Sequence, residues 1–355
     1  MITRQFLILA LVLQATGAAG AAAQTDTSAP EHVATHFEIT LVPSNTGEHV
    51  LAEVETSWRL GSAAPVVAEL DSTFRVVRVL MDGKPNTRIS RTQYARGPGD
   101  VMVPHEKPAG DTLTTRIRYH GIPRGGLRAG PNRYGARTLV AQAATVDPAL
   151  WLPVPERMPG TASVAFHVQA DSGGRAIANG VLIRVDTLAY GHTTWRYRLD
   201  QPIPLSAVAA AAGPYATAAL PLQACTPACA PVSVWTWSGD SAFAAQGPFR
   251  RAAGMMEFFT RLLGRPPYPT LAHVEAAIPT AVIPGASVIL YAESGYADRT
   301  LDEAVVARET ARQWLRPGAP DSAAAYLATI WRSSAEGGAT KTPDLAPIRG
   351  FLRSP

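Results

Sequence analysis

Two arginines and a glutamate, Arg308, Glu309 and Arg312, stand close together in a segment whose pattern predicts a helix over residues 300–315. A spacing of four residues places both guanidinium groups on one helix face, with the apolar residues that we expect to face inward: Leu301, Val305 and Leu315. A guanidinium group does not lose its proton and is rarely buried without an anionic partner. The arginine heads must therefore reach water or the Glu309 carboxylate, or bind an anionic group such as a peptide carboxylate.

The ends of this predicted helix carry their own signals. Thr300 can cap the N-terminus while Glu303, three residues later, reaches back to it, which is the arrangement of a capping box. The sequence Arg316-Pro317-Gly318 predicts the end of the helix, because proline and glycine do not continue it.

The ten residues VVARETARQW, positions 305–314, resemble the zinc-site helix of the aminopeptidase N family of gluzincin metallopeptidases. The family pattern is H-E-x-x-H-Q-W, in which two histidines four residues apart bind zinc and the glutamate between them is the general base. The resemblance assigns the general-base position to Glu309 and the two ligand positions to Arg308 and Arg312. Because both histidines are replaced, it also implies that the zinc site has been lost.

The family's third zinc ligand is a glutamate on the next helix, and two positions compete for it here. Asp321 lies in a segment of helical character and also predicts an N-cap, whereas Glu336 matches the letters of the family motif. We favour Asp321. No histidine follows His273, so no nearby imidazole can replace the missing ligands. At about 4 Å and an effective dielectric near 20, each guanidinium would repel a cation by roughly 4 kcal/mol per unit charge, so we expect no metal cofactor.

Three further positions correspond to substrate contacts in the family. Gly285 and Ala286 fall in a segment that takes the place of the family's G-x-M-E-N, an edge-strand motif whose glutamate binds the amino terminus of a peptide. Val288 or Pro284 stands at the glutamate position, depending on the alignment, and neither carries a carboxylate. The family has a second substrate-binding region, which contains a Gln or Glu. In the corresponding segment of this sequence, only Gln142 could bind substrate.

Short segments of alternating apolar and polar residues, separated by turn signals, predict an antiparallel β domain over residues 34–217. Strands are expected at 36–41, 50–60, 66–70, 74–81 and 112–119, with a hairpin tip at Asp82-Gly83. Three phrases in this region resemble the N-terminal saddle domain of the same family: Tyr119-His120-Gly121-Ile122-Pro123, Trp151-Leu152-Pro153 and Ala178-Asn179-Gly180. The resemblance implies a β saddle domain.

Residues 218–355 predict a mixed domain, with a strand at 232–237 followed by a helix between Pro248 and Gly264. The stretch LGRPPYP at 263–269 resembles the family's F-G-x-Y-P, which implies a partial thermolysin-like α+β domain. In the family the catalytic domain continues well beyond its zinc helices and carries a tyrosine that supports the transition state. We therefore expect a C-terminally truncated remnant of that domain.

The first 23 residues have the features of a secretory signal peptide: an arginine at position 4, an apolar stretch over 6–13 and three alanines before Gln24. Residues 24–33 predict a polar linker. The apolar stretch is too short to span a membrane, so we expect an exported protein, periplasmic or secreted. Export favours a disulfide between the two cysteines, Cys225 and Cys229.

Charge and motif content argue against several classes of function. The net charge is +4, and the basic residues are scattered without a stripe or interleaved aromatic residues, so we expect no nucleic-acid partner. The sequence has no phosphate-binding loop and no dinucleotide fingerprint. Residues 239–243 begin like a nucleophile elbow, but Phe243 replaces its last glycine.

We therefore expect an exported protein similar to aminopeptidase N that has lost catalysis, a pseudo-peptidase with a peptide or an exported protein as its binding partner. The alternative is an active zinc metallo-aminopeptidase that removes N-terminal residues from peptides, completed by a partner chain. A third alternative is a decaying gene fragment with no selected role.

Overall fold

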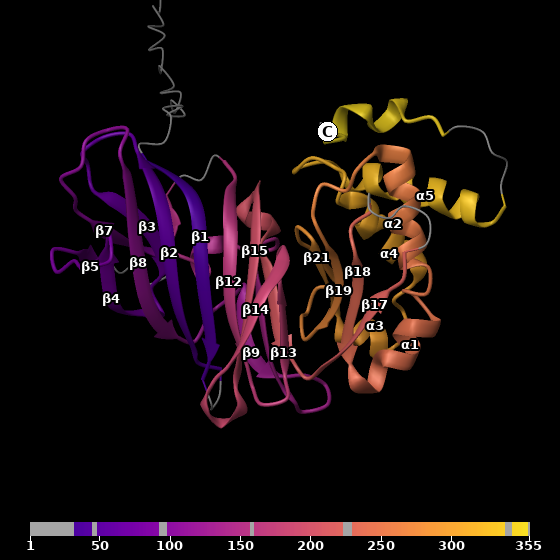
Figure 1. Ribbon diagram of the computed structural model, residues 1–355, viewed down its shortest axis with the longest axis horizontal. Coiled ribbons are helices and arrows are strands. Elements are labelled where there is room, and N and C mark those ends of the chain that lie inside the picture. Colours follow the sequence, from indigo (N-terminus) through magenta and orange to yellow (C-terminus); the bar gives the residue numbers. More distant parts are fainter. Residues whose placement is uncertain are drawn as a thin grey trace, which may run out of the picture.

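The computed structural model describes residues 32–44, 48–91, 98–156, 160–222, 229–337 and 343–353. The predicted signal peptide, residues 24–31 of the predicted linker and Cys225 lie outside these ranges. The predicted mixed β and α/β fold is confirmed: three sheets fill the N-terminal part, and the helices gather on a fourth sheet near the C-terminal end (Figure 1).

The largest sheet has eight strands in the order β14-β15-β12-β1-β2-β8-β4-β5. Their bounds are β1 His32–Pro43, β2 Val50–Leu60, β4 Arg75–Met81, β5 Lys84–Pro85, β8 Thr112–Gly121, β12 Ala162–Ala170, β14 Val181–Thr187 and β15 Thr193–Ile203. Buried and partly exposed side chains alternate along β1, β2, β8 and β12, because one face of the sheet packs on the core. β1 begins at His32, so the last two residues of the predicted linker belong to a strand.

The predicted hairpin tip is also confirmed. Met81 pairs with Lys84, and the two residues between them, Asp82 and Gly83, have φ angles of 47° and 76°. Two successive positive φ angles are typical of the tight turn that matches the twist of a hairpin, and Asp-Gly is a favoured pair for it.

Two four-stranded sheets complete the N-terminal part, in the orders β13-β16-β10-β9 and β11-β3-β7-β6. Their bounds are β3 Val66–Asp71, β6 Ser90–Arg91, β7 Pro98–Val103, β9 Leu127–Pro131, β10 Arg137–Gln142, β11 Val154–Pro155, β13 Arg175–Ala178 and β16 Ala209–Gly213. Trp151 is fully buried between these elements. A Cβ on Gly126, whose φ is 73°, would lie 2.5 Å from the Trp151 ring, so only glycine fits there.

The fourth sheet has the order β17-β18-β19-β21-β20, with β18, β19 and β21 parallel and β20 antiparallel at one edge. Its strands are β17 Tyr215–Leu220, β18 Val232–Trp237, β19 Leu271–Ala276, β20 Val282–Pro284 and β21 Val288–Ala292. The predicted domain boundary after residue 217 falls within β17. Along β21 the side chains of Val288 and Leu290 join the core of the N-terminal part, whereas Ile289 and Tyr291 join a second core under the helices.

Five α-helices accompany this sheet: α1 Ser241–Gln246, α2 Ala252–Leu263, α3 Glu293–Ala297, α4 Glu303–Arg312 and α5 Asp321–Ala335. Figure 1 shows them on the side of the sheet that faces away from the N-terminal strands. Residues Ala346–Phe351 form a short 3-10 helix after α5. Among the described residues, no helix has the length and apolar character needed to cross a membrane. Cys229 is buried and disulfide-bonded, and its predicted partner is one of the residues outside the described ranges.

Candidate functional site

Helix α4, which carries the charged residues, is shorter than predicted. It begins at Glu303, and its N-cap is Asp302, whose carboxylate accepts a hydrogen bond from the Val305 backbone N–H at 2.9 Å. The predicted capping box of Thr300 and Glu303 is wrong, because the Thr300 backbone N–H closes the turn after α3 by donating to the Gly295 carbonyl. The Glu303 carboxylate instead pairs with Arg251 at 2.7 Å.

The inward face of α4 also differs from the prediction. The side chains that it buries are those of Val306, Ala307, Glu309, Thr310 and Ala311. Val305, Arg308 and Arg312 lie at the border of this face and are only partly buried. The helix is therefore rotated so that the carboxylate, and not the two arginines, lies at the centre of its buried face.

Arg308, Glu309, Arg312 and Asp321 form one connected group, which we call the ion cluster. Nε of Arg308 donates to Oε1 of Glu309 at 2.8 Å, and Nε of Arg312 donates to Oε2 of the same carboxylate at 2.8 Å. A terminal nitrogen of Arg312 also donates to Oδ1 of Asp321 at 2.5 Å. The cluster thus joins α4 to the first residue of α5.

Opposite charges are paired in this cluster. The Glu309 side chain is 2% exposed, so its negative charge needs the two guanidinium partners that it has. Burial alone would lower the pKa of Arg312, but its hydrogen bonds and ion pairs with Glu309 and Asp321 raise that pKa overall. The hydrogen bond from Arg312 also lowers the pKa of Asp321.

Asp321 does not cap α5 as predicted. The N-cap is Pro320, and Asp321 is the first helical residue, where its carboxylate turns toward Arg312 instead of the helix backbone. Glu336, the competing third-ligand position, is exposed beyond the far end of the same 15-residue helix. Of the two candidates, only Asp321 lies in the ion cluster.

The family that the sequence resembles binds a zinc ion at this helix, and the residues of the ion cluster do not fit one. Zinc binds neutral imidazole, thiolate or carboxylate, whereas a guanidinium group offers only donors. Both oxygens of Glu309 already accept hydrogen bonds from arginine. The last histidine in the sequence, His273, is buried on β19 and hydrogen-bonded to the Tyr291 hydroxyl at 2.9 Å. Within the described ranges, no three His, Cys, Asp or Glu side chains form a group that could hold a metal.

The segment expected to contact substrate lies between strands β20 and β21. β20 is the edge strand and ends at Pro284, whereas Val288 is buried inside β21. Of the two positions aligned with the family's glutamate, Pro284 therefore lies on the edge strand and Val288 lies inside the sheet. Ser287 has a φ of 61°, and its backbone N–H donates to Oε1 of Gln313 at 3.0 Å. The Gln313 amide also donates to the Gly285 carbonyl at 3.2 Å, which ties this loop to the end of α4.

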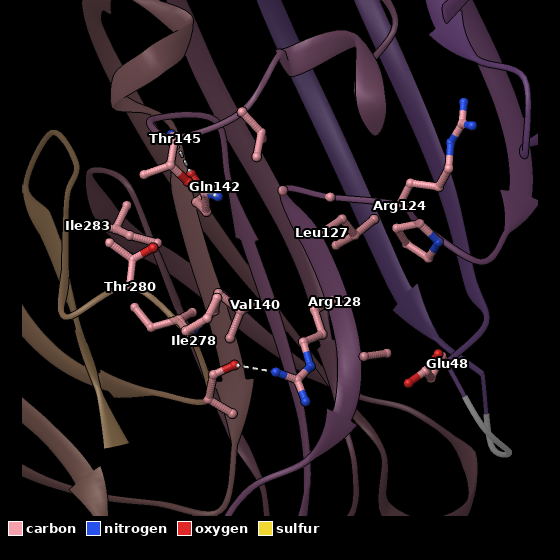
Figure 2. Close-up of a pocket in the computed structure, with 17 residues that line it drawn as sticks. Glu48, Arg124, Leu127, Arg128, Val140, Gln142, Thr145, Ile278, Thr280 and Ile283 are labelled. Atoms are coloured by element: carbon pink, nitrogen blue, oxygen red, sulfur yellow. Dashed lines mark hydrogen bonds between the residues drawn. The ribbon is translucent and has the colours of Figure 1, made fainter. Parts of the chain in front are cut away.

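Gln142 lies at the end of β10 and lines a cavity of about 350 Å³ between the two parts of the molecule. Figure 2 shows its amide directed toward Thr145, and its Nε2 donates to the Thr145 hydroxyl at 2.9 Å. Its Oε1 accepts the backbone N–H groups of Ala144 and Thr145. The side chain that the sequence suggested for substrate binding therefore stabilises its own turn. Ile283 of the edge strand lies across the same cavity.

A second cavity, of about 220 Å³, lies at the other end of the edge strand, and we call it the arginine pocket. Gly285, Ala286 and Arg312 all line it. The sequence-predicted site residues are thus divided: Gln142 belongs to the first cavity and the others to the ion cluster or the arginine pocket. Arg316 and Arg353 also line this pocket, and no motif in the sequence marks either of them as a site residue. The sequence around Arg316 predicts only the end of a helix.

A buried acidic group where β18, β19 and β21 end was missed as well. The Glu275 carboxylate accepts the Trp237 backbone N–H at 2.9 Å, and it lies beside Asp240, which forms an ion pair with Arg133. Burial raises the pKa of Glu275 to about 9, and the neighbouring Asp240 carboxylate adds to that rise. Glu275 therefore binds a proton at neutral pH. Arg133 belongs to the N-terminal part, and its backbone N–H donates to the Glu293 carboxylate at 2.8 Å.

No protein-family profile and no curated protein matches this sequence. Solved structures do match its fold. An M1 zinc metallopeptidase from Deinococcus radiodurans superimposes with a TM-score of 0.69 and 18% sequence identity, over 87% of this chain and 72% of the other. The same values hold for a Glu-to-Ala mutant of that protein bound to a Tyr-Ser-Ala substrate. They also hold for a two-domain M1 zinc metallopeptidase mutant bound to L-arginine. The chain therefore has the fold of M1 zinc metallopeptidases, combining their N-terminal β domain with part of the catalytic domain.

Proposed function

We propose that this chain is a non-catalytic, exported protein built on the M1 peptidase fold, with a binding role in place of hydrolysis. The observation that carries the proposal is the ion cluster. Arg308 and Arg312 hold both oxygens of Glu309, the residue that stands where the related zinc peptidases have their general base. Export rests on the predicted signal peptide.

Two physical arguments support the loss of catalysis. A general base must reach the water or group whose proton it takes, whereas Glu309 is 2% exposed and occupied by two cationic donors. Each guanidinium within about 4 Å of a divalent cation would oppose it by roughly 8 kcal/mol at an effective dielectric near 20, twice the value for a single charge. The carboxylates of Glu309 and Asp321 could at most cancel these two terms, and nothing then replaces the two missing imidazole ligands.

The same contacts support a structural role for the arginines. Arg312 donates hydrogen bonds to Glu309 on its own helix, α4, and to Asp321 at the start of α5. It therefore joins the two helices. The cavity of about 350 Å³ beside the edge strand is lined by apolar side chains, among them those of Ile278 and Ile283. It offers space for a segment of a binding partner. A peptide or an exported protein is the proposed class of partner.

Metal analysis of the purified protein tests this proposal. We expect less than 0.1 zinc per chain by plasma mass spectrometry after incubation with excess zinc and gel filtration, and no hydrolysis of aminoacyl-naphthylamides. The matched variant Arg308→His/Arg312→His removes both positive charges and restores imidazoles. We expect this variant to retain measurably more zinc than the natural chain.

Stoichiometric zinc in the natural chain would overturn the proposal. Hydrolysis that a chelator and Glu309→Ala both abolish would establish the alternative, an active zinc aminopeptidase. Equal zinc retention by the natural chain and the double-histidine variant would show that the arginines are not what prevents metal binding.

A further inference from the structure

The arginine pocket carries positive charge without a negative group in its wall. Three guanidinium-bearing residues line it, Arg312, Arg316 and Arg353, and no aspartate or glutamate is among its lining residues. Tyr268 and the backbone around Gly285 contribute polar groups to the same wall. Like charges that converge on one cavity repel one another unless an anion lies among them.

The pocket arginines are held in place by neutral acceptors. Nε of Arg353 donates to the Leu315 carbonyl at 2.9 Å, and a terminal nitrogen donates to the Tyr268 hydroxyl at 2.5 Å. The Arg353 guanidinium also lies 5.0 Å from the centre of the Tyr268 ring. Arg316 donates to the Gly350 carbonyl. These contacts orient the cationic heads through acceptors that carry no charge.

Arg312 is the only one of the three whose charge is balanced. Its carboxylate partners are Glu309 and Asp321, and both belong to the ion cluster. In the part of the chain that the structure describes, neither Arg316 nor Arg353 has a carboxylate within 4.0 Å. The pocket therefore has a net positive charge carried by two guanidinium groups with preset orientations, an arrangement suited to planar anions.

We propose that the arginine pocket binds the carboxylate of a small molecule or of a peptide C-terminus. Guanidinium groups bind carboxylates through paired hydrogen bonds. Beside them, Pro204, Ala207, Ala286 and Leu315 supply apolar contacts for the carbon atoms next to such a group. Binding involves no covalent step.

This inference names a ligand class for the binding role proposed above and rests on that proposal, because a metal at the ion cluster would displace Arg312. Zinc content is therefore measured on the same protein sample. If the protein contains no metal and binds no carboxylate, the proposal for the pocket is wrong and the proposed function stands. If it contains stoichiometric zinc, the proposed function is wrong.

Calorimetric titration at low salt in a buffer free of phosphate tests the pocket. The probe is N-acetyl-Ala-Ala with a free carboxylate, and its matched partner is the same dipeptide with an amidated C-terminus. We expect the free acid to bind at least tenfold more tightly than the amide. Arg316→Gln and Arg353→Gln should each weaken binding of the free acid about tenfold. Added sodium chloride should weaken it further.

Arg332→Gln is the control, because Arg332 is exposed on α5 and does not line the pocket. It should leave binding unchanged. Arg353→Lys keeps the charge and should retain more affinity than Arg353→Gln, and thermal melting of each variant checks that it is folded. Equal binding of acid and amide, or binding that survives in folded Arg316→Gln, would overturn the proposal. Binding of inorganic phosphate without binding of the dipeptide acid would overturn the carboxylate assignment.

Discussion

At the level of single residues, the Arg308 and Arg312 guanidinium groups decide the character of the site around Glu309. Both donate to this one buried carboxylate, which forms the centre of the ion cluster. A guanidinium group is permanently charged and offers only hydrogen-bond donors, so these two residues set both the charge and the coordination chemistry of the site. Glu275 shows the opposite case, a carboxyl group whose surroundings favour its neutral form.

Glu275 predicts a pH dependence of stability. Its pKa of about 9 in the folded protein lies above the ordinary value of 4.5, so between these two pH values the native state binds more protons than the unfolded state. The contribution of this group to the free energy of unfolding therefore falls as the pH rises from about 4.5 to 9. In Glu275→Gln the side chain stays neutral, so the variant should gain stability relative to the natural chain as the pH increases. Urea unfolding at pH 5, 7 and 9 measures this difference.

The titratable groups around Glu275 include Asp240, Arg133 and the tyrosine hydroxyls of Tyr134, Tyr215 and Tyr296, and Glu275→Gln replaces none of them. The control is Glu336→Gln, which replaces an exposed carboxylate and should give a difference that does not change over the same pH range. A stability difference between Glu275→Gln and the natural chain that stays constant from pH 5 to 9 would contradict the prediction.

Among the secondary-structure elements, the end of α4 and the loop after the edge strand act together. Gln313 accepts the buried backbone N–H of Ser287 and donates to the carbonyl of Gly285, so one side chain fixes the strained turn, with its positive φ at Ser287. Gln313 also occurs in the family pattern, directly after the second zinc-ligand position. In this structure its hydrogen bonds hold the loop and involve no metal.

Gln313→Ala should therefore destabilise the protein by about 1–3 kcal/mol, because a buried backbone donor and acceptor lose their partner. Denaturant unfolding followed by tryptophan fluorescence measures the change. Gln246→Ala removes an exposed glutamine at the end of α1 and should shift stability by less than about 0.5 kcal/mol. Equal effects of the two substitutions would show that the loop is held by other contacts.

In the molecule as a whole, the fourth sheet lies between two cores and belongs to both parts of the fold. Asn179 shows how closely the parts are joined. Its amide donates to the carbonyls of Ala207 and Ala286 and accepts the Ala209 N–H, so it bridges the N-terminal sheets to the loop after the edge strand. A Cβ on Gly285 would lie 2.9 Å from the Ala209 side chain, which leaves no space between the two parts there.

We therefore expect the two parts to unfold in one cooperative transition, with far-ultraviolet circular dichroism and tryptophan fluorescence giving the same midpoint. Asn179→Ala should lower both midpoints together, corresponding to a loss of about 2 kcal/mol, because two buried backbone groups, the Ala286 carbonyl and the Ala209 N–H, lose a partner. Gln201→Ala, on an exposed position of β15, is the control. Separate transitions, or the absence of a cooperative transition, would contradict this prediction and favour a decaying fragment.

The sequence by itself determined the period-two strands, the hairpin at Asp82-Gly83, the position of α4 along the chain and the charges on it, because these follow from local pattern and residue type. Predictions from local sequence patterns were wrong where contacts outside the predicted helix compete with those patterns. Thr300 closes the preceding turn instead of capping α4, and burial of Glu309 rotates the helix away from the face that the aliphatic residues suggested.

Only the tertiary structure decided which charges meet. The arginine pocket combines Arg312 at the end of α4 with Arg353, 41 positions later, and with Pro204 of the N-terminal part. Glu275 and Asp240 come together because parallel strands β18 and β19 end at the same edge of one sheet. Residue type shows which groups can carry charge, but the distance between charges and their burial set the energy, and both depend on chain packing.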